Sequence, residues 1–186
     1  MTKYKEIIGT DIEVVTSDPT VTGQVWYNES EGELKTRNQF VGNAWSTGGN
    51  LNTARSRPGG AGTQTAALAF GGDTPSSPPV IANTEAYDGS SWTEVNDLNT
   101  ARAQLGGCGA TNTAALAFGG IIPTASPNNT ALTESWNGTN WTEVGDLNTA
   151  RSSTASGGPY TSALCFGGSP VPGGKGALTE AWNGTN

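Results

Sequence analysis

Apolar positions along this chain of 186 residues come in short runs bounded by Gly, Pro, Asn, Ser and Thr. The clearest run ends in two glycines and occurs as TAALAFGG at residues 65–72 and 113–120, and as TSALCFGG at residues 161–168. A short apolar run that stops at paired glycines is typical of a strand buried on both faces and ended by a turn. No stretch has the period of a useful amphipathic helix. The pattern therefore predicts an all-β chain.

These runs belong to a longer internal repeat. Phe70, Phe118 and Phe166 follow one another at steps of 48 residues, and each is preceded by the phrase Asn-Thr-Ala-Arg. Self-similarity at a period of about 20–50 residues indicates an array of small structural units. Because such units use their residues for stacking, we expect recognition or construction rather than catalysis.

A second landmark is an aromatic-x-Gly-x-x-Trp phrase at residues 40–45, 87–92 and 136–141, which begins again at Trp182. TEAYDGSSWTEV and TESWNGTNWTEV each predict two strands joined at Asp-Gly or Asn-Gly, a strong hairpin signal. The glycine-rich stretch after each Arg adds another strand, so we expect four strands per unit. The expected organisation is an N-terminal segment at residues 1–22, a hairpin and half blade at 23–50, complete blades at 51–97 and 98–146, and a shortened blade at 147–186.

The unit resembles the kelch repeat. In its second copy the matching landmarks are Arg102, Gly119-Gly120, Glu134 with Trp136, and Trp141. The resemblance implies a radial β-propeller with aromatic side chains packed between blades. Propellers typically have about four to eight blades, so an array of three and a half leads us to expect that the natural polypeptide continues beyond Asn186. The expected structural repeat positions are Arg55, Arg102, Arg151, Phe70, Phe118, Phe166, Trp45, Trp92 and Trp141.

Residues 23–35 (GQVWYNESEGELK) predict a hairpin with a polar turn. Together with Pro19, Phe40 and the GNAW of residues 42–45, this sequence resembles a segment of tailed-phage structural proteins. The sequence AGTQTAALAFGG of residues 61–72 resembles repeat proteins of marine phages, cyanophages in particular. The resemblance implies that residues 1–22 dock to other virion proteins while the repeats face outward. We therefore expect residues 1–22 to be extended and to gain order from a partner rather than from this chain. Many such fibres are trimers, so a homotrimer is expected, although the chain has no heptad or collagen-like stretch.

Composition narrows the choice of partners. Charged residues make up 13% of the chain, against about 25% in ordinary globular proteins, and the net charge is −7. A nucleic-acid platform would need clustered Lys and Arg, so we expect no nucleic-acid partner. Residues 1–20 lack the apolar core of a signal peptide, and no run reaches the roughly 18 apolar residues of a membrane span. We therefore expect no membrane insertion, and location in a virion released by lysis.

The sequence lacks the histidine on which many catalytic and metal sites depend. There is no histidine, which excludes Ser-His-Asp triads and histidine-based zinc or copper sites. Glu85, Glu134 and Glu180 share one repeat position, which favours a structural role. Cys108 and Cys165 replace alanines of other repeats, which indicates packing. We expect no enzyme activity, cofactor or metal, although a calcium role for Asp73, Asp88 or Asp97 stays open.

Three stretches do not repeat: residues 73–83, 121–132 and 169–178, each between the second and third strands of its blade. Variable loops on a rigid scaffold are where recognition residues concentrate. We expect them to lie on one side of the array and to meet a host surface glycan or protein, the alternative being that they are connectors. The candidate receptor-facing residues are Asp73, Thr74, Ser76, Ser77, Asn83, Thr124, Ser126, Asn128, Asn129, Ser169 and Lys175.

The leading functional hypothesis is a phage virion protein, in a tail fibre or other surface appendage, that contributes to host attachment. A cellular kelch-type interaction scaffold is the alternative. A carbohydrate-active enzyme on a propeller is a third possibility, disfavoured by the absence of histidine and of unrepeated paired carboxylates. On any of these readings Phe70, Phe118 and Phe166 should pack between blades. The three repeated arginines should brace each blade, either against backbone carbonyls or against the repeated Glu.

Overall fold

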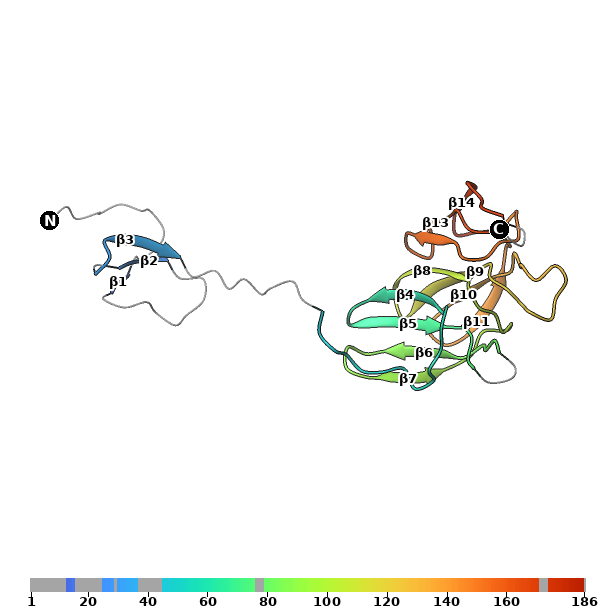
Figure 1. Cartoon of the computed structure of the whole chain (residues 1–186), viewed down its shortest axis with the longest axis horizontal. Helices are drawn as coiled ribbons and strands as arrows, with labels where there is room; N and C mark the ends of the chain where they lie inside the picture. The colour runs from blue at the N-terminus through green and yellow to red at the C-terminus, as the bar shows by residue number, and fades with distance from the viewer. Residues whose placement is uncertain are drawn as a thin grey trace. The chain divides into compact units, whose positions relative to one another are not determined.

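A computed structural model describes residues 13–15, 25–28, 30–36, 45–75, 79–170 and 174–185 of the chain. The chain divides into two compact units, residues 1–46 and residues 47–186, and each is described by itself. All regular elements in the described ranges are β-strands, which confirms the predicted all-β class (Figure 1).

The first unit holds a three-stranded sheet of β1 (Glu13–Val15), β2 (Val25–Asn28) and β3 (Glu33–Thr36). β2 and β3 form the predicted antiparallel hairpin, and the Asn28 side chain accepts hydrogen bonds from the backbone N–H groups of Ser30 (3.0 Å) and Glu31 (3.3 Å) in its turn. Residues 1–22 were expected to gain order only from a partner. For β1 this expectation is wrong, because β1 pairs in parallel with β2 of the same chain. The rest of that segment lies outside the described residues.

The second unit contains three antiparallel sheets whose strands follow sequence order, as in propeller blades. Blade 1 consists of β4 (Gly59–Thr63), β5 (Ala66–Phe70), β6 (Thr84–Tyr87) and β7 (Trp92–Val95). Blade 2 consists of β8 (Gly106–Thr111), β9 (Ala114–Phe118), β10 (Thr133–Trp136) and β11 (Trp141–Val144). Blade 3 has three strands among the residues described, β12 (Ala155–Gly157), β13 (Ala163–Phe166) and β14 (Thr179–Trp182).

The hairpin turns follow from local chemistry. In blade 1 the Asp88 side chain accepts hydrogen bonds from the N–H groups of Ser90 and Ser91, both at 2.8 Å, and Gly89 has the positive φ of 99° that the turn needs. These hydrogen bonds stabilise the carboxylate and hold the pKa of Asp88 well below its usual value. Asn137 plays the same part in blade 2. The Asp-Gly and Asn-Gly signals were therefore correct predictors of these hairpins.

The first strands of the blades line up in the order β4, β8, β12, and apolar side chains of the second strands pack between the blades. Leu68 and Phe70 of blade 1 form a core cluster with Ala115, Ala117, Trp136 and Trp141 of blade 2. At the next interface Leu116 and Phe118 meet Ala163 and Cys165 of blade 3. Each interface thus places a Leu-x-Phe pair of one blade on small residues of the next.

Glycines on the first strands allow the blades to approach closely. A Cβ added to Gly107 would lie 2.5 Å from Cζ of Phe70 and 2.8 Å from the carbonyl oxygen of Gly60 in the neighbouring blade. A Cβ at Gly59 would lie 2.4 Å from the same Phe70 ring. The ring is therefore held between glycines of two adjacent first strands, where no side chain would fit.

Two expected packing positions are exposed among the residues that the structure describes. Phe70 and Phe118 are 0% and 3% exposed, but Phe166 is 42% exposed, because no described residue covers that face of blade 3. Trp45, expected in the last hairpin of an earlier blade, is fully exposed. Residues 40–44, which begin that hairpin, lie outside the described residues.

Candidate functional site

Each non-repeating loop starts from the same kind of anchor. Asp73, Ile121 and Ser169 follow the Phe-Gly-Gly phrases and form isolated antiparallel bridges with Ser56, Ala103 and Ser152, respectively. These three partners belong to the segments that lead into the first strands β4, β8 and β12. Every loop is therefore fixed at its start to the inner part of its own blade.

The three lead-in segments are also bonded to one another. Arg57, Gln104 and Ser153 occupy one repeat position, and all have left-handed backbones with φ between 54° and 56°. The N–H of Gln104 donates to the Arg57 carbonyl (3.0 Å), and the N–H of Ser153 donates to the Gln104 carbonyl (2.8 Å). The loops thus leave the array on one face, called here the loop face and defined as the described residues of 73–83, 121–132 and 169–178. The β6–β7 and β10–β11 turns lie at the opposite ends of the strands.

Asp73, the first candidate residue of the loop face, is engaged within the chain. Its carboxylate accepts hydrogen bonds from Arg57 Nε (2.8 Å) and Nη2 (2.9 Å) and from the Ser56 hydroxyl (3.2 Å). The hydrogen bonds from Arg57 lower the pKa of Asp73, and the same pairing raises the pKa of Arg57. Asp73 therefore serves to fix its loop, and its charge is balanced there.

Three further candidates also hold the frame together. The Asn83 carbonyl accepts from Arg55 Nη1 at 2.6 Å, and its side-chain amide donates to Glu94. Asn129 Nδ2 donates to the Ser169 carbonyl at 2.7 Å, which ties the loop of blade 2 to blade 3. The Ser169 hydroxyl donates to the Gly174 carbonyl at 2.6 Å. Their polar groups are used for positioning, which sequence alone did not reveal.

Four candidates present exposed polar side chains on the loop face: Thr124, Ser126, Asn128 and Lys175. Thr74 is half-buried, and its N–H donates to the Pro79 carbonyl at 2.8 Å. Ser76 and Ser77 lie outside the described residues.

The loop of blade 2 is closed on itself. The N–H of Ile122 donates to the Asn128 carbonyl and the N–H of Ala125 donates to the Ile122 carbonyl, both at 2.9 Å. Thr124, Ser126 and Asn128 are thereby grouped on one short turn. Their hydroxyl and amide groups both donate and accept hydrogen bonds, which suits a sugar or a neutral polar protein surface.

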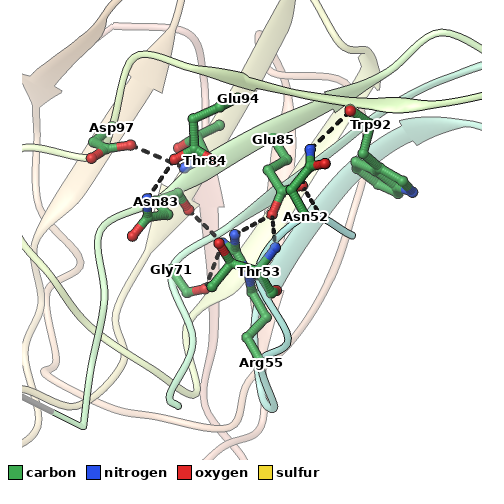
Figure 2. Close-up of polar contacts among 10 residues, drawn as sticks. All are labelled: Asn52, Thr53, Arg55, Gly71, Asn83, Thr84, Glu85, Trp92, Glu94 and Asp97. Carbon is green, nitrogen blue, oxygen red and sulfur yellow. Dashed lines mark hydrogen bonds and ion pairs between the residues drawn. The ribbon is translucent and has the colours of Figure 1, made fainter. Parts of the chain in front are cut away.

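A buried polar clamp repeats in each blade, and Figure 2 shows it in blade 1. Glu85 accepts from the guanidinium of Arg55 and from the backbone N–H (2.7 Å) and side-chain amide (2.9 Å) of Asn52. The Asn52 amide also donates to the Trp92 carbonyl at 2.8 Å. Arg55 also donates to the carbonyls of Gly71, just after β5, and of Asn83, just before β6. The clamp therefore ties the end of β5 to β6 and β7.

The same clamp is built from Arg102, Glu134 and Asn99 in blade 2 and from Arg151, Glu180 and Asn148 in blade 3. Burial lowers the pKa of Arg102, and the charge of Glu134 opposes that effect. The asparagines were not singled out from the sequence, although their recurrence in the Asn-Thr-Ala-Arg phrase was a usable signal. Within each clamp the Arg and Glu charges pair with each other, which gives these side chains a structural role.

The part of the chain that the structure describes contains no group of three or more His, Cys, Asp or Glu side chains able to hold a metal ion, and no helix that could cross a membrane. Cys108 and Cys165 are buried free thiols, and burial raises the pKa of Cys108 to about 11. Neither thiol is placed as a nucleophile, because a raised pKa keeps it protonated.

No family model and no curated protein matches the chain. A solved structure described as that of YjhT does match in fold, with a TM-score of 0.59 and 11% sequence identity. The shared fold is a β-propeller. The match covers 84% of this chain but 47% of YjhT, so the chain spans about half the length of that protein.

Proposed function

We propose that this chain is a structural protein of a tailed-phage particle, located in a tail fibre or another surface appendage, and that it contributes to host attachment through its loop face. The observation that supports the proposal is the contrast between frame and loops. Three loops of different length and sequence emerge together from a frame whose clamps, glycines and aromatic contacts repeat. Variable loops on a rigid scaffold are the usual arrangement of a recognition surface.

The chemistry of the loop face favours a neutral polar ligand. Thr124, Ser126 and Asn128 are exposed hydrogen-bonding groups, whereas the charge of Asp73 is balanced by Arg57. Pro123 and Pro170 restrict the loop backbone and so lower the entropy lost on binding. A surface glycan or a polar protein surface of the host fits these properties.

Substitutions on the loop face test this role. Phage carrying Thr124→Ala, Ser126→Ala, Asn128→Ala and Lys175→Ala together should lose most of their adsorption to host cells. A matched control carries Thr93→Ala and Thr142→Ala, which remove exposed hydroxyls from the outer strands β7 and β11. Unchanged adsorption of the loop-face variant would mean that the loops only connect strands and do not bind the host.

The N-terminal unit is the proposed attachment to other virion proteins. Its β2–β3 hairpin lies in the part of the sequence that resembles tailed-phage structural proteins. Phage made with a chain that lacks residues 2–43 should show no labelled blades on the virion by electron microscopy, while the purified fragment keeps its β-sheet circular dichroism. Label found only in host cytoplasm with the intact chain would reject a virion location altogether.

A further inference from the structure

The turn between β10 and β11 places an asparagine directly before a glycine. Asn137 and Gly138 are both exposed, and Gly138 has a left-handed backbone with a φ of 93°. The backbone nitrogen of a residue can attack the side-chain carbonyl carbon of an asparagine that precedes it. A glycine leaves this nitrogen unshielded, because it has no Cβ. The pair therefore meets the first requirement for loss of ammonia from the asparagine side chain.

The attacking nitrogen is not engaged elsewhere. Within the part of the chain that the structure describes, the Gly138 N–H donates no hydrogen bond. A Cβ built on Gly138 would have the Thr113 carbonyl oxygen as its nearest neighbour outside the adjacent residues, at 3.4 Å, so Gly138 is not tightly enclosed. A base can therefore remove the amide proton without first breaking a backbone hydrogen bond.

The carbonyl under attack is polarised by the turn. Asn137 Oδ1 accepts hydrogen bonds from the N–H groups of Thr139 at 2.9 Å and of Asn140 at 2.8 Å. Attack at Cγ of Asn137 places negative charge on this same oxygen. Backbone N–H groups that already point at a developing oxyanion lower its free energy. The contacts that build the turn thus favour the reaction at Asn137.

The product of the reaction has a counterpart in blade 1. Asp88 occupies the repeat position of Asn137, and its carboxylate accepts from the N–H groups of Ser90 and Ser91, both at 2.8 Å. These hydrogen bonds favour the ionised form and hold the pKa of Asp88 well below its usual value. An aspartate at position 137 would receive the same two N–H groups. Blade 1 therefore shows that this hairpin accepts the product.

We propose that Asn137 is a site of spontaneous deamidation in the folded protein, with water as the co-reactant. The Gly138 nitrogen loses its proton to a base in the solvent and forms a bond to Cγ of Asn137. The bond from Cγ to Nδ2 breaks, ammonia leaves, and a five-membered succinimide remains. Water then opens this ring at one of its two carbonyl groups. The net reaction converts a side-chain amide and water into a carboxylate and an ammonium ion.

The other Asn-Gly pair of the chain has part of the same arrangement. Asn183 is exposed and is followed by Gly184, which has a φ of 86°. Asn183 Oδ1 accepts hydrogen bonds from the N–H and from the hydroxyl of Thr185, both at 3.0 Å. Asn183 is therefore a second site of the same kind, in blade 3.

The reacting turn is also a contact between blades 1 and 2. Asn96 Nδ2 donates to the Thr139 carbonyl at 2.9 Å and to Asn140 Oδ1 at 2.8 Å. Opening of the succinimide at Cγ gives an aspartate and leaves the backbone unchanged. Opening at the backbone carbonyl gives an isoaspartate, whose backbone is one methylene longer just before the paired residues Trp136 and Trp141 close the hairpin. The isoaspartate form should therefore weaken the contact with Asn96, and the aspartate form should keep it.

The first test follows each asparagine separately in the 186-residue chain. Folded protein and a sample in urea are kept in a mildly alkaline buffer, and protease digests taken at intervals are analysed by mass spectrometry for replacement of an amide NH2 by OH. In the folded protein, conversion at Asn137 should be several-fold faster than at Asn140, which is equally exposed in the same turn but precedes the bulky Trp141. Conversion of Asn137 in urea alone, or equal rates at the two asparagines in the folded protein, would overturn the proposal.

The second test transfers the reaction to blade 1. Asp88→Asn places an asparagine before Gly89, in a turn whose Ser90 and Ser91 N–H groups already point at the side-chain oxygen. Position 88 of this variant should convert back to aspartate at a rate within a few-fold of that at Asn137 in the same molecule. A variant that keeps its β-sheet circular dichroism but shows no conversion at position 88 would refute the role assigned to the turn.

The third test examines the end state. Asn137→Asp should have the same midpoint of urea unfolding as the unsubstituted chain, because Asp88 already occupies the equivalent position in blade 1. The isoaspartate fraction of aged protein, identified through labelling by an isoaspartyl methyltransferase, should unfold at a lower urea concentration. A midpoint for Asn137→Asp as low as that of the isoaspartate fraction would contradict the claim that the turn accepts the product.

Discussion

The guanidinium of Arg102 lies 3.1 Å from the carboxylate of Glu134, and their side chains are 0% and 3% exposed. Such a pair is not necessarily a net stabiliser, since taking both charges out of water is costly. The pair recurs in three blades, each time with an asparagine at the same repeat position. This recurrence indicates that the pair holds the strands of a blade in one arrangement. The first prediction concerns what happens when one partner is removed.

Glu134→Gln or Arg102→Met should each destabilise the blades by about 3–5 kcal/mol, because either change leaves a buried charge without its partner. The double variant Arg102→Met with Glu134→Leu should lose less than either single variant. Urea unfolding followed by tryptophan fluorescence measures these losses. Arg57→Ala, at the exposed pair with Asp73, is the control and should cost about 0–1 kcal/mol. Equal losses at both pairs would contradict the special role of the buried clamp.

The aromatic positions of the second strands should differ sharply. Phe70→Ala should cost about 3–5 kcal/mol, because the ring is fully buried between two blades. Phe166→Ala should cost much less, because that ring is 42% exposed. Chemical denaturation of the two proteins at one concentration makes the comparison, and similar losses would contradict the observed difference in burial.

The glycines of the first strands can be tested with a matched pair. Gly107→Ala should destabilise the contact between blades 1 and 2, because its Cβ meets both the Phe70 ring and the backbone of Gly60. Gly157→Ala on β12 should be neutral or slightly stabilising, since no atom lies within 4 Å of the added Cβ. Thermal unfolding of the two variants separates a steric effect from a general effect of adding a methyl group.

Asp73 should titrate below the usual range of an aspartate near pH 3.9. The folded pKa is lowered mainly by hydrogen bonds from Arg57, so the stability that this pair supplies is present above the unfolded pKa and is lost as the pH falls through the folded pKa. Carboxyl chemical shifts measured by NMR between pH 2 and 6 give the midpoint. Arg57→Ala should move it upward, and an unchanged midpoint would show that another group sets the pKa.

The two thiols should be unreactive in the folded chain. Both are buried, and burial raises the pKa of Cys108 to about 11, so little thiolate exists at neutral pH. A chromogenic disulfide reagent at pH 8 should label neither cysteine at once, and both after denaturation. Rapid labelling of the native protein would contradict the packing of the second interface.

Sequence pattern predicted the blades well because their determinants are local or periodic. The Asp-Gly and Asn-Gly turns, the paired glycines and the apolar LAF runs each specify a strand end or a buried strand within a few residues. The arginines were recognised through their recurrence alone, and the contact with Glu85 and its equivalents was one of two expectations for them.

The expectations that differ from the structure concern positions whose environment is supplied by another part of the molecule. Phe166 and Phe118 occupy the same repeat position. Blade 3 covers Phe118, whereas no described residue covers Phe166. Asp73 and Asn83 look like free polar loop residues in the sequence, yet Arg57 and Glu94 engage them from neighbouring segments. Such assignments depend on three-dimensional neighbours that a repeat alignment does not contain.

The hydrogen bonds that run from Arg57 to Gln104 to Ser153 have a mechanical consequence. They link the base of each loop to the base of the next across the blade boundaries, backbone to backbone. A pull on one loop therefore reaches three blades at once instead of peeling a single hairpin from its sheet. Force applied at the loop face would be spread along this line of amides and carbonyls, and the side chains at the loop tips could change without weakening it.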